Sequence, residues 1–264
     1  MNRFVIYSII LIYSLLFFRC EIEDKKVIKN PDSSNFTEKI DSIVLPEKVE
    51  IKPIEVCEWN DYLRSKNLVN IQEVNRSLMV ELKYSSEDNF MHKDMYGCLD
   101  SCFLQPDVAQ KLSTAQQLLK EINPRLSLLI YDGVRPRSVQ QYMWDILDMP
   151  INEKVKFVSN PKNGSLHNFG AAVDITIYDL DSLTPLDMGV PYDYIGIKAW
   201  PIKEKMLLKK GILTEQQITN RKLLRRVMTK AKFFNIQTEW WHFNSCSRKK
   251  AYQLYSIVEG GDEL

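Results

Sequence analysis

The sequence predicts an α+β fold in a single domain, because strand-like and helical stretches follow each other without a regular βαβ alternation. Strand-like patterns cover residues 78–84, 126–131 and 172–178, and helical periodicity appears between and after them. A doubly wound parallel sheet would instead alternate strands and helices strictly. Residues 55–264 contain no Gly/Ser linker and no repeat, so we expect one compact domain over that range.

Composition and charge exclude several classes of protein. The chain has 264 residues, 45% of them hydrophobic, and a chain of this length can bury roughly 70% or more of its unfolded surface. A formal charge of +1 gives no electrostatic footprint for nucleic acid, and we expect no such partner. Nine glycines and 11 prolines are too few for a collagen-like or low-complexity chain. The sequence indicates no particular oligomeric state.

Residues 1–20 have the pattern of an export signal. Arg3 precedes an apolar stretch from Phe4 to Phe18, which is followed by Arg19 and Cys20. A basic start and a short apolar run are typical of a signal peptide, whereas a membrane-spanning helix needs about 20 apolar residues. An uncleaved signal anchor is the alternative. Cys20 stands where a lipoprotein signal would end, but the residues before it are larger than usual, so lipidation stays open.

Residues 21–54 are rich in Lys, Glu, Asp, Asn, Ser and Pro and have no sustained period. Such a segment cannot bury enough apolar area to order itself, so we expect a flexible tether. Contact with a membrane would then be made only through the N-terminal signal or a lipid anchor. We therefore expect an exported protein that lies in the periplasm or is anchored facing it.

Four cysteines follow the expected signal, and export would permit disulfides between them. A small loop closed by Cys98 and Cys102, with Cys57 paired to Cys246, is one arrangement. Four cysteines allow three pairings, however, and the sequence does not choose among them.

The first elements of the domain are expected in the order strand, helix, strand. Leu78–Tyr84 alternates apolar and polar residues as a half-buried strand does. Pro106 suits the first position of a helix, and apolar residues follow it at helical spacing. Leu126–Tyr131 is a short apolar run and is expected to be a buried strand.

The second half of the domain is expected to begin with a helix over Ser138–Leu147, capped by Ser138, and a strand over Ala172–Tyr178. A long helix follows over Thr214–Lys232, where Thr214 and Gln217 have the spacing of a capping box. Phe233–Phe243 is strand-like. A last helix is expected to begin at Ser247 and run toward Val258.

Two polar residues, His167 and Asp174, lie in an otherwise small or apolar segment. Asp174 falls between Val173 and Ile175, where a buried carboxylate is costly unless it is paired or bound to a metal. His167 lies in the turn before this strand, and Gly170 leaves room for close backbone approach. The two side chains could therefore converge at the start of the strand, although each alone is also typical of a satisfied core or edge residue.

A second cluster is the segment TEWWHF, in which Glu239 and His242 stand among large aromatic residues. With His167 and Asp174, His242 gives three zinc ligands and leaves a fourth position for water, as in catalytic zinc sites. Glu239 stays free to accept a proton from that water and to pass it to a leaving amine. The chain has only three histidines, and His92 is expected near the pocket rim without a metal role.

Arg135 follows the buried strand and precedes Pro136, which favours an extended backbone at the arginine. The planar fork of donors on a guanidinium suits an oxyanion or a carboxylate. Asp132 could pair with Arg135 and fix its rotamer. A surface arginine in a turn is the alternative interpretation.

These blocks, in this order, resemble the D-alanyl-D-alanine dipeptidases, which are zinc peptidases related to the D,D-carboxypeptidases. The resemblance covers about Val69 to Asn244. It rests on the Arg-Pro block, on S-x-H-N-x-G-x-A-x-D from Ser165, on M-G-x-P-Y-D at 188–193 and on E-W-W-H at 239–242. The second block and E-x-x-H are typical of the wider superfamily, whereas E-W-W-H and M-G-x-P-Y-D favour the dipeptidases. The Cys98–Cys102 segment lies outside the family pattern.

The resemblance implies a small α+β domain, flanked by helices, whose central and mostly antiparallel sheet carries one zinc ion. It implies zinc ligands at His167, Asp174 and His242. It also implies Glu239 as the general base and then the general acid, and Arg135 as the group that stabilises the oxyanion.

The resemblance further implies that Asp193 binds the free amine of the substrate and that Ser165 contacts the substrate near its carboxylate. A carboxylate that expects an ammonium would reject an acylated amine. The expected activity is therefore zinc-dependent hydrolysis of D-Ala-D-Ala to two D-Ala, in cell-wall peptide turnover. A D,D-carboxypeptidase acting on peptidoglycan stem peptides is one alternative. A non-catalytic zinc-bearing binding module is another, against which the intact Glu239 and Arg135 argue.

Overall fold

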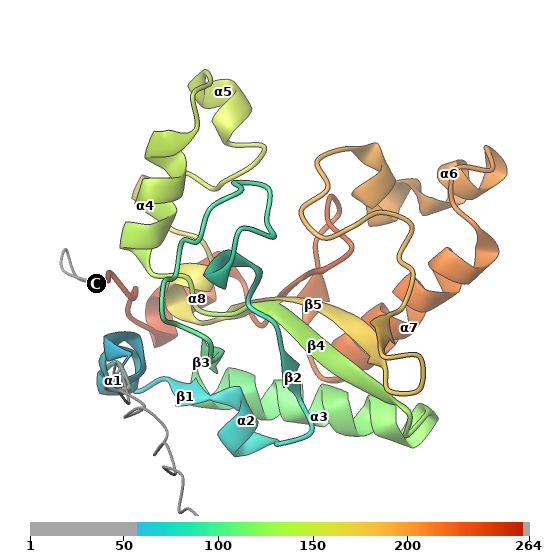
Figure 1. The fold of residues 1–264 in the computed structure, drawn as a ribbon, viewed down its shortest axis with the longest axis horizontal. Coiled ribbons are helices and arrows are strands. Elements are labelled where there is room, and N and C mark those ends of the chain that lie inside the picture. Colours follow the sequence, from blue (N-terminus) through green and yellow to red (C-terminus); the bar gives the residue numbers. More distant parts are fainter. Residues whose placement is uncertain (1–56, 261–264) are drawn as a thin grey trace, which may run out of the picture. The chain divides into compact units, whose positions relative to one another are not determined.

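The computed structural model of the protein describes residues 57–260 (Figure 1), so the signal and tether expected at 1–20 and 21–54 lie outside the described residues. Its centre is a six-stranded sheet in which β2, β4, β5, β8 and β7 follow each other and β6 pairs with β5. Only β2 and β4 are parallel, which confirms the mostly antiparallel sheet. The strands are β2 (Met79–Val80), β4 (Leu126–Asp132), β5 (Ala172–Asp179), β6 (Thr184–Pro185), β7 (Phe234–Asn235) and β8 (His242–Asn244).

Helices cover the sheet, and the longest two are α3 (Pro106–Ile122) and α7 (Glu215–Lys230). Figure 1 shows α3 running below β4 and α7 beside the far end of β5. A separate two-stranded sheet joins β1 (Val69–Asn70) to β3 (Phe103–Leu104). The other helices are α1 (Glu58–Ser65), α2 (Ile71–Val74), α4 (Arg137–Ile146), α5 (Ile151–Lys154), α6 (Glu204–Lys209) and α8 (Arg248–Leu254).

The sequence patterns with the clearest local cause are confirmed. Helix α3 has Pro106 in its first turn, and all of β4 is buried, as its apolar run predicts. Strand β5 covers the whole of the expected 172–178 strand and one residue more. Helix α7 begins with the expected capping box, because the Thr214 hydroxyl accepts from the Gln217 N–H and the Gln217 side chain accepts from the Thr214 N–H.

The single strand expected at 233–243 is wrong. The segment forms two short antiparallel strands, β7 and β8, joined by a turn that includes Glu239. Trp240 and Trp241 are both buried although they are adjacent, which a continuous half-buried strand does not allow. The aromatic residues of this segment therefore belong to a turn packed into the core and to the two short strands beside it.

Three other elements differ at their ends. Strand β2 covers only Met79–Val80, and a 3₁₀ turn follows at Lys83–Ser85. Helix α4 begins one residue before Ser138, which does not cap it. The N–H groups of Arg137 and Ser138 donate instead to the carbonyls of Val258 and Glu259, so a segment distant in sequence caps the helix. Helix α8 follows Ser247 as expected but ends at Leu254.

The cysteines do not pair as Cys98–Cys102 and Cys57–Cys246. A disulfide joins Cys57 to Cys98, and Cys102 and Cys246 are free and buried. Cys102 belongs to the main core, whereas Cys246 packs in a smaller cluster beneath α8. Within residues 57–260, no helix has the length and apolar character needed to cross a membrane.

The capping box at the start of α7 gives a stability prediction. Replacing Thr214 by Ala removes the acceptor of the Gln217 N–H and should lower the free energy of unfolding by about 1 kcal/mol. Thr229 is an exposed residue of the same helix and serves as the matched control. Thr229→Ala should leave stability unchanged or slightly raised, because alanine has the higher helix propensity. Urea unfolding of both variants measures the difference, and equal midpoints would contradict the capping role.

Candidate active site

A cavity of about 260 Å³ lies beside the paired segments of β5 and β8. Its volume is slightly below the roughly 300–1,000 Å³ of pockets that hold drug-sized ligands, which suits a small substrate. All seven site residues predicted from the sequence line it: Arg135, Ser165, His167, Asp174, Asp193, Glu239 and His242. His92 does not line this cavity but borders a neighbouring hollow, and within residues 57–260 it belongs to no group of three potential metal ligands.

Strand pairing explains why two of the candidate ligands meet. Asp174 of β5 lies directly opposite His242 of β8 in the antiparallel register. Residues paired in this way have Cβ atoms about 4.5–5.5 Å apart and share a face of the sheet. His167 reaches the same point from a 3₁₀ turn at His167–Phe169, and Gly170 ends that turn in the left-handed conformation.

The three ligand atoms lie close together. His242 Nδ1 is 2.9 Å from Asp174 Oδ1, and His167 Nε2 is 3.1 Å from His242 Nδ1 and 3.4 Å from Asp174 Oδ1. Tetrahedral zinc with bonds of about 2.0–2.1 Å would keep its ligand atoms about 3.3 Å apart. The spacing therefore fits a zinc-sized ion.

The remaining ring nitrogens define which atoms are free to bind a metal. His167 Nδ1 lies 2.7 Å from the Gly133 carbonyl oxygen, and His242 Nε2 lies 2.9 Å from Asn244 Oδ1. Because an oxygen of this kind only accepts, each of these nitrogens carries the proton of a neutral ring. Lone pairs on His167 Nε2, His242 Nδ1 and Asp174 Oδ1 then face each other, and a cation satisfies all three.

The pKa shifts of His242 and Asp174 also indicate that a positive charge is favoured at this site. Burial alone would lower the pKa of His242, but its hydrogen bond to Asp174 and the charges of Asp174 and Glu239 raise this pKa to about 9. Burial would also raise the pKa of Asp174, yet the two histidines hold it well below its usual range. A positive charge is therefore favoured between these three side chains.

Tyr192 fixes the second carboxylate oxygen of Asp174, a contact that the sequence does not predict. The Tyr192 hydroxyl donates to Asp174 Oδ2 at 2.9 Å, which leaves Oδ1 directed at the histidines. The Tyr192 ring contacts the rings of Tyr131 and Trp241, with centroids 5.1 and 5.5 Å away. Tyr192 belongs to the M-G-x-P-Y-D block, but no local pattern shows where its hydroxyl points.

Glu239 lies in the turn between β7 and β8, and Asn235 holds both ends of the segment that carries it. The Asn235 amide donates to the carbonyl oxygens of Glu239 at 2.9 Å and His242 at 2.8 Å. Burial raises the pKa of Glu239, and Asp174 adds to this, while His242 partly opposes it. A carboxylate with a raised pKa suits a group that accepts a proton and then returns it.

Arg135 is held by Asp132, as the sequence suggested. Its Nε donates to Asp132 Oδ2 at 3.0 Å, and a second guanidinium N–H donates to the same oxygen. Tyr96 donates to the other oxygen of Asp132 at 2.6 Å. The guanidinium lies 4.8 Å from the centre of the Tyr84 ring and lines the cavity. Its rotamer is thus fixed with a positive charge facing the metal ligands.

Ser165 belongs to a buried network that also positions Arg135. The Ser165 hydroxyl donates to Gln140 Oε1 at 2.8 Å. The Asn168 amide donates to the Arg135 carbonyl at 2.7 Å and to the same Gln140 oxygen, and its own oxygen accepts from the Ser165 N–H. Since the Ser165 proton is engaged, the lone pairs of its oxygen are what it offers to the cavity.

Asp193 stands at the far wall of the cavity in a left-handed backbone conformation, with φ of 58°. Tyr84 donates a hydrogen bond of 2.9 Å to its carboxylate. Burial, together with the charge of Asp174, raises the pKa of Asp193 well above its usual range, and the Tyr84 hydrogen bond and Arg135 only partly oppose this. Among residues 57–260, no Lys, Arg or His side chain lies within salt-bridge distance of this carboxylate.

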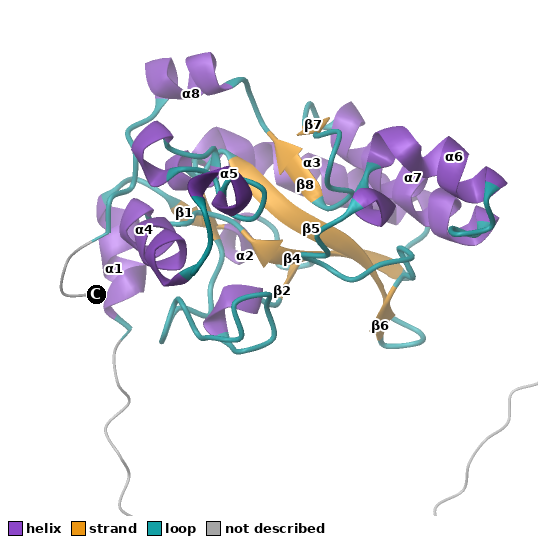
Figure 2. Cartoon of the chain, turned by 90° about the horizontal axis from the view of Figure 1, so that it is seen from above, coloured by secondary structure: helices purple, strands orange, loops and turns teal. Residues whose placement is uncertain are grey.

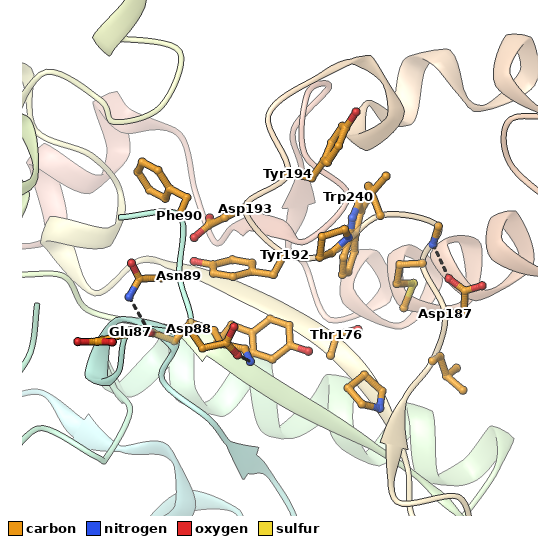
Figure 3. A pocket seen from close by; sticks show the side chains of 18 of the residues that line it. Glu87, Asp88, Asn89, Phe90, Thr176, Asp187, Tyr192, Asp193, Tyr194 and Trp240 are labelled. Atoms are coloured by element: carbon orange, nitrogen blue, oxygen red, sulfur yellow. Dashed lines mark hydrogen bonds and ion pairs between the residues drawn. The ribbon is translucent and has the colours of Figure 1, made fainter. Parts of the chain in front are cut away.

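A larger hollow of about 670 Å³ adjoins the cavity and shares Phe90 and Asp193 with it. Figure 3 shows Phe90 on one flank of this hollow, Trp240 and Thr176 on the other, and Tyr192 with Asp193 between them. Thr176 Oγ1 and Trp240 Nε1 are buried without a hydrogen-bond partner, so the hollow carries two unsatisfied polar atoms.

Comparison with known proteins agrees with this site. The family model peptidase M15, described as D-ala-D-ala dipeptidase, matches residues 64–257. A D-alanyl-D-alanine dipeptidase of Escherichia coli is 30% identical over 176 residues, which are 67% of this chain and 83% of the relative. Proteins of the same name from Synechocystis sp. and Enterococcus faecium are 29% and 24% identical, over 57% and 66% of this chain and 72% and 88% of theirs. The matched region contains all seven predicted site residues, and the chain belongs to the peptidase M15 family of D-Ala-D-Ala dipeptidases.

Proposed function

We propose that the protein is a zinc-dependent dipeptidase that hydrolyses D-Ala-D-Ala to two D-alanines, in the turnover of cell-wall peptides. The observation that carries this proposal is the position of Asp193. A half-buried carboxylate, with no cation at salt-bridge distance among the described residues, shares a small cavity with the three candidate ligands, Glu239 and Arg135. The names of the relatives support the choice of substrate.

The candidate ligands His167, Asp174 and His242 would hold the zinc ion. When bound there, zinc supplies a Lewis acid that polarises the scissile carbonyl and lowers the pKa of the attacking water toward ~7. Glu239 accepts one proton from this water and delivers it to the leaving amine. Water is thereby added across one amide bond, which gives two amino acids.

Arg135 acts where negative charge develops on the former carbonyl oxygen. Its guanidinium is already oriented by Asp132 and Tyr84, so little reorganisation is needed during the reaction. Fixed donors of this kind stabilise a transition state more than the ground state. The Asn168 amide donates to the Arg135 carbonyl, and both Asn168 and Ser165 donate to the Gln140 side-chain oxygen, which holds the Arg135 and Ser165 segments together.

Asp193 selects the length of the substrate. A free amino terminus places an ammonium against its carboxylate, whereas an acylated amine would leave that carboxylate buried and unpaired. Sites built for a specific polar partner reject analogues that lack it by large factors. We therefore assign a preference for the free dipeptide over longer peptides.

The larger hollow favours a second candidate function, a D,D-carboxypeptidase acting on peptidoglycan stem peptides. It adjoins the cavity at Asp193, where the residues preceding the scissile pair would continue in a longer substrate. The choice between the two functions depends on whether a substrate with an acylated amine can bind beside Asp193 and be cleaved.

We also propose that the enzyme works outside the cytoplasm. The apolar stretch near the N-terminus supports export, and the Cys57–Cys98 disulfide supports an oxidising compartment. Cell-wall fragments released there would be the source of the dipeptide.

Release of D-Ala from D-Ala-D-Ala by the zinc-loaded protein tests the function, with Glu239→Gln as the catalytic variant. Loss of the proton acceptor should lower kcat by about 10²–10⁴-fold. Zinc content should remain one per chain, because Glu239 is not among the three ligands. Glu121→Gln, at an exposed position of α3, should behave as wild type. Wild-type protein that releases no D-Ala, or a Glu239→Gln variant with full activity, would overturn the proposal.

A comparison of D-Ala-D-Ala with its N-acetyl derivative separates the two candidate functions. A dipeptidase should cleave the acetylated peptide at least about 10²-fold less efficiently in kcat/KM, since Asp193 would face no ammonium. Asp193→Asn should reduce this discrimination. Efficient cleavage of N-acylated peptides would favour the carboxypeptidase.

Tyr192→Phe tests the support of Asp174. Removing the hydroxyl that binds Asp174 Oδ2 should weaken zinc binding about 10–100-fold, as loss of an outer-shell partner commonly does. Competition with a chelator measures the affinity. Tyr194→Phe is the matched control, because the Tyr194 hydroxyl makes no hydrogen bond to any of the three ligands. Equal zinc affinity of Tyr192→Phe and wild type would show that Asp174 does not depend on Tyr192.

A further inference from the structure

The charges along the active-site cavity leave one requirement of the substrate unassigned. This inference rests on the proposed function: a free D,D-dipeptide carries an ammonium at one end and a carboxylate at the other. The Asp193 carboxylate would bind the ammonium. The carboxylate needs a cation or several hydrogen-bond donors that are not already engaged.

Two donors that could serve the carboxylate are engaged elsewhere. Arg135 is a cation of the cavity wall, but two of its N–H groups donate to Asp132 and its face lies on the Tyr84 ring. The Ser165 hydroxyl donates its proton to Gln140. Gln140 cannot release it freely, because the Gln140 amide nitrogen is itself held by the Ser159 carbonyl at 2.8 Å.

Arg248 is the other arginine that lines the cavity, and it is uncommitted. Within residues 57–260, no acidic group lies within salt-bridge distance of its guanidinium. Arg248 is the first residue of α8, and the Ser247 hydroxyl accepts from the Lys250 N–H at 3.3 Å to begin that helix. Its charge is therefore free to meet a ligand at the cavity mouth.

Asn244 lines the same part of the cavity and offers a second donor. Its amide oxygen is fixed by His242 Nε2, so its NH₂ group is the part that remains free. Figures 1 and 2 show α8 and the loop between β6 and α6, which carries Asp193, on different sides of the start of β5. Asp174 and His242 line the same cavity as Arg248 and Asp193. An extended dipeptide of about 7 Å has its charged ends separated in the same way.

We propose that Arg248, with the Asn244 amide beside it, binds the C-terminal carboxylate of the substrate and determines the preference for a free C-terminus. The guanidinium presents paired N–H donors whose geometry matches a carboxylate. Together with Asp193, this gives the cavity one anionic and one cationic end, so that a zwitterionic dipeptide binds in a single orientation. Ser165, which the family resemblance places near the substrate carboxylate, offers lone pairs and no free proton, so it is suited to an N–H of the substrate instead.

The test compares D-Ala-D-Ala with its C-terminal amide, D-Ala-D-Ala-NH₂, in wild type and in Arg248→Gln. Wild type should prefer the free acid by about 10–100-fold in kcat/KM, the range that one hydrogen-bonded charge provides. Arg248→Gln should lose most of this preference through a higher KM for the acid, with kcat/KM for the amide little changed. Arg248→Lys should restore part of the preference. Lys249→Gln, the neighbouring exposed residue that does not line the cavity, is the matched control.

The outcomes separate this proposal from the proposed function. A structural defect in Arg248→Gln would lower the activity on the acid and the amide by equal factors, and an unchanged ratio would therefore overturn the assignment of Arg248. Wild-type protein that releases no D-Ala from D-Ala-D-Ala would overturn the proposed function and this assignment together. A ratio that falls toward one in Arg248→Gln alone would establish Arg248 as the carboxylate-binding residue.

Discussion

The structure depends on the convergence of three electron pairs that repel each other unless a cation lies among them. His167 Nε2, His242 Nδ1 and Asp174 Oδ1 stand within 3.4 Å of one another at the start of β5. No local preference of the chain would bring them there. The register of β5 and β8 and the 3₁₀ turn before β5 hold two of them on adjacent strands and the third above them. The fold therefore maintains an arrangement that is stable only when a positive charge fills it.

Several polar groups around this point orient the residues that would bind zinc or act on the substrate. Asp132 orients Arg135, Tyr192 orients Asp174, and Asn244 orients His242. Asp193 and Glu239 are the carboxylates left with raised pKa values, and both are reserved for groups that arrive with the substrate or with water. Supporting residues of this kind contribute to affinity and rate without touching the reacting atoms.

The sequence was sufficient for elements whose cause is local and for residues that stand out chemically. Pro106, the capping box at Thr214 and the apolar run of β4 predicted their elements, and the two histidines with Asp174 predicted the metal site. The turn inside 233–243, the cap of α4 by the distant residues 258–259 and the Cys57–Cys98 bond could not be predicted. Each depends on which segments meet in space, and neither periodicity nor spacing contains that information.

The Cys57–Cys98 disulfide also determines how the domain responds to mechanical force. Tension applied through the chain that precedes Cys57 crosses the sulfur–sulfur bond directly to Cys98, 41 residues further along. The covalent path between the two cysteines carries none of the load. That bypassed path includes α1 and the segment with Tyr84 and Phe90 that walls the cavity. Pulling on the N-terminal side of the domain would therefore not stretch the chain that carries Tyr84 and Phe90, because this wall of the cavity lies outside the covalent line of force.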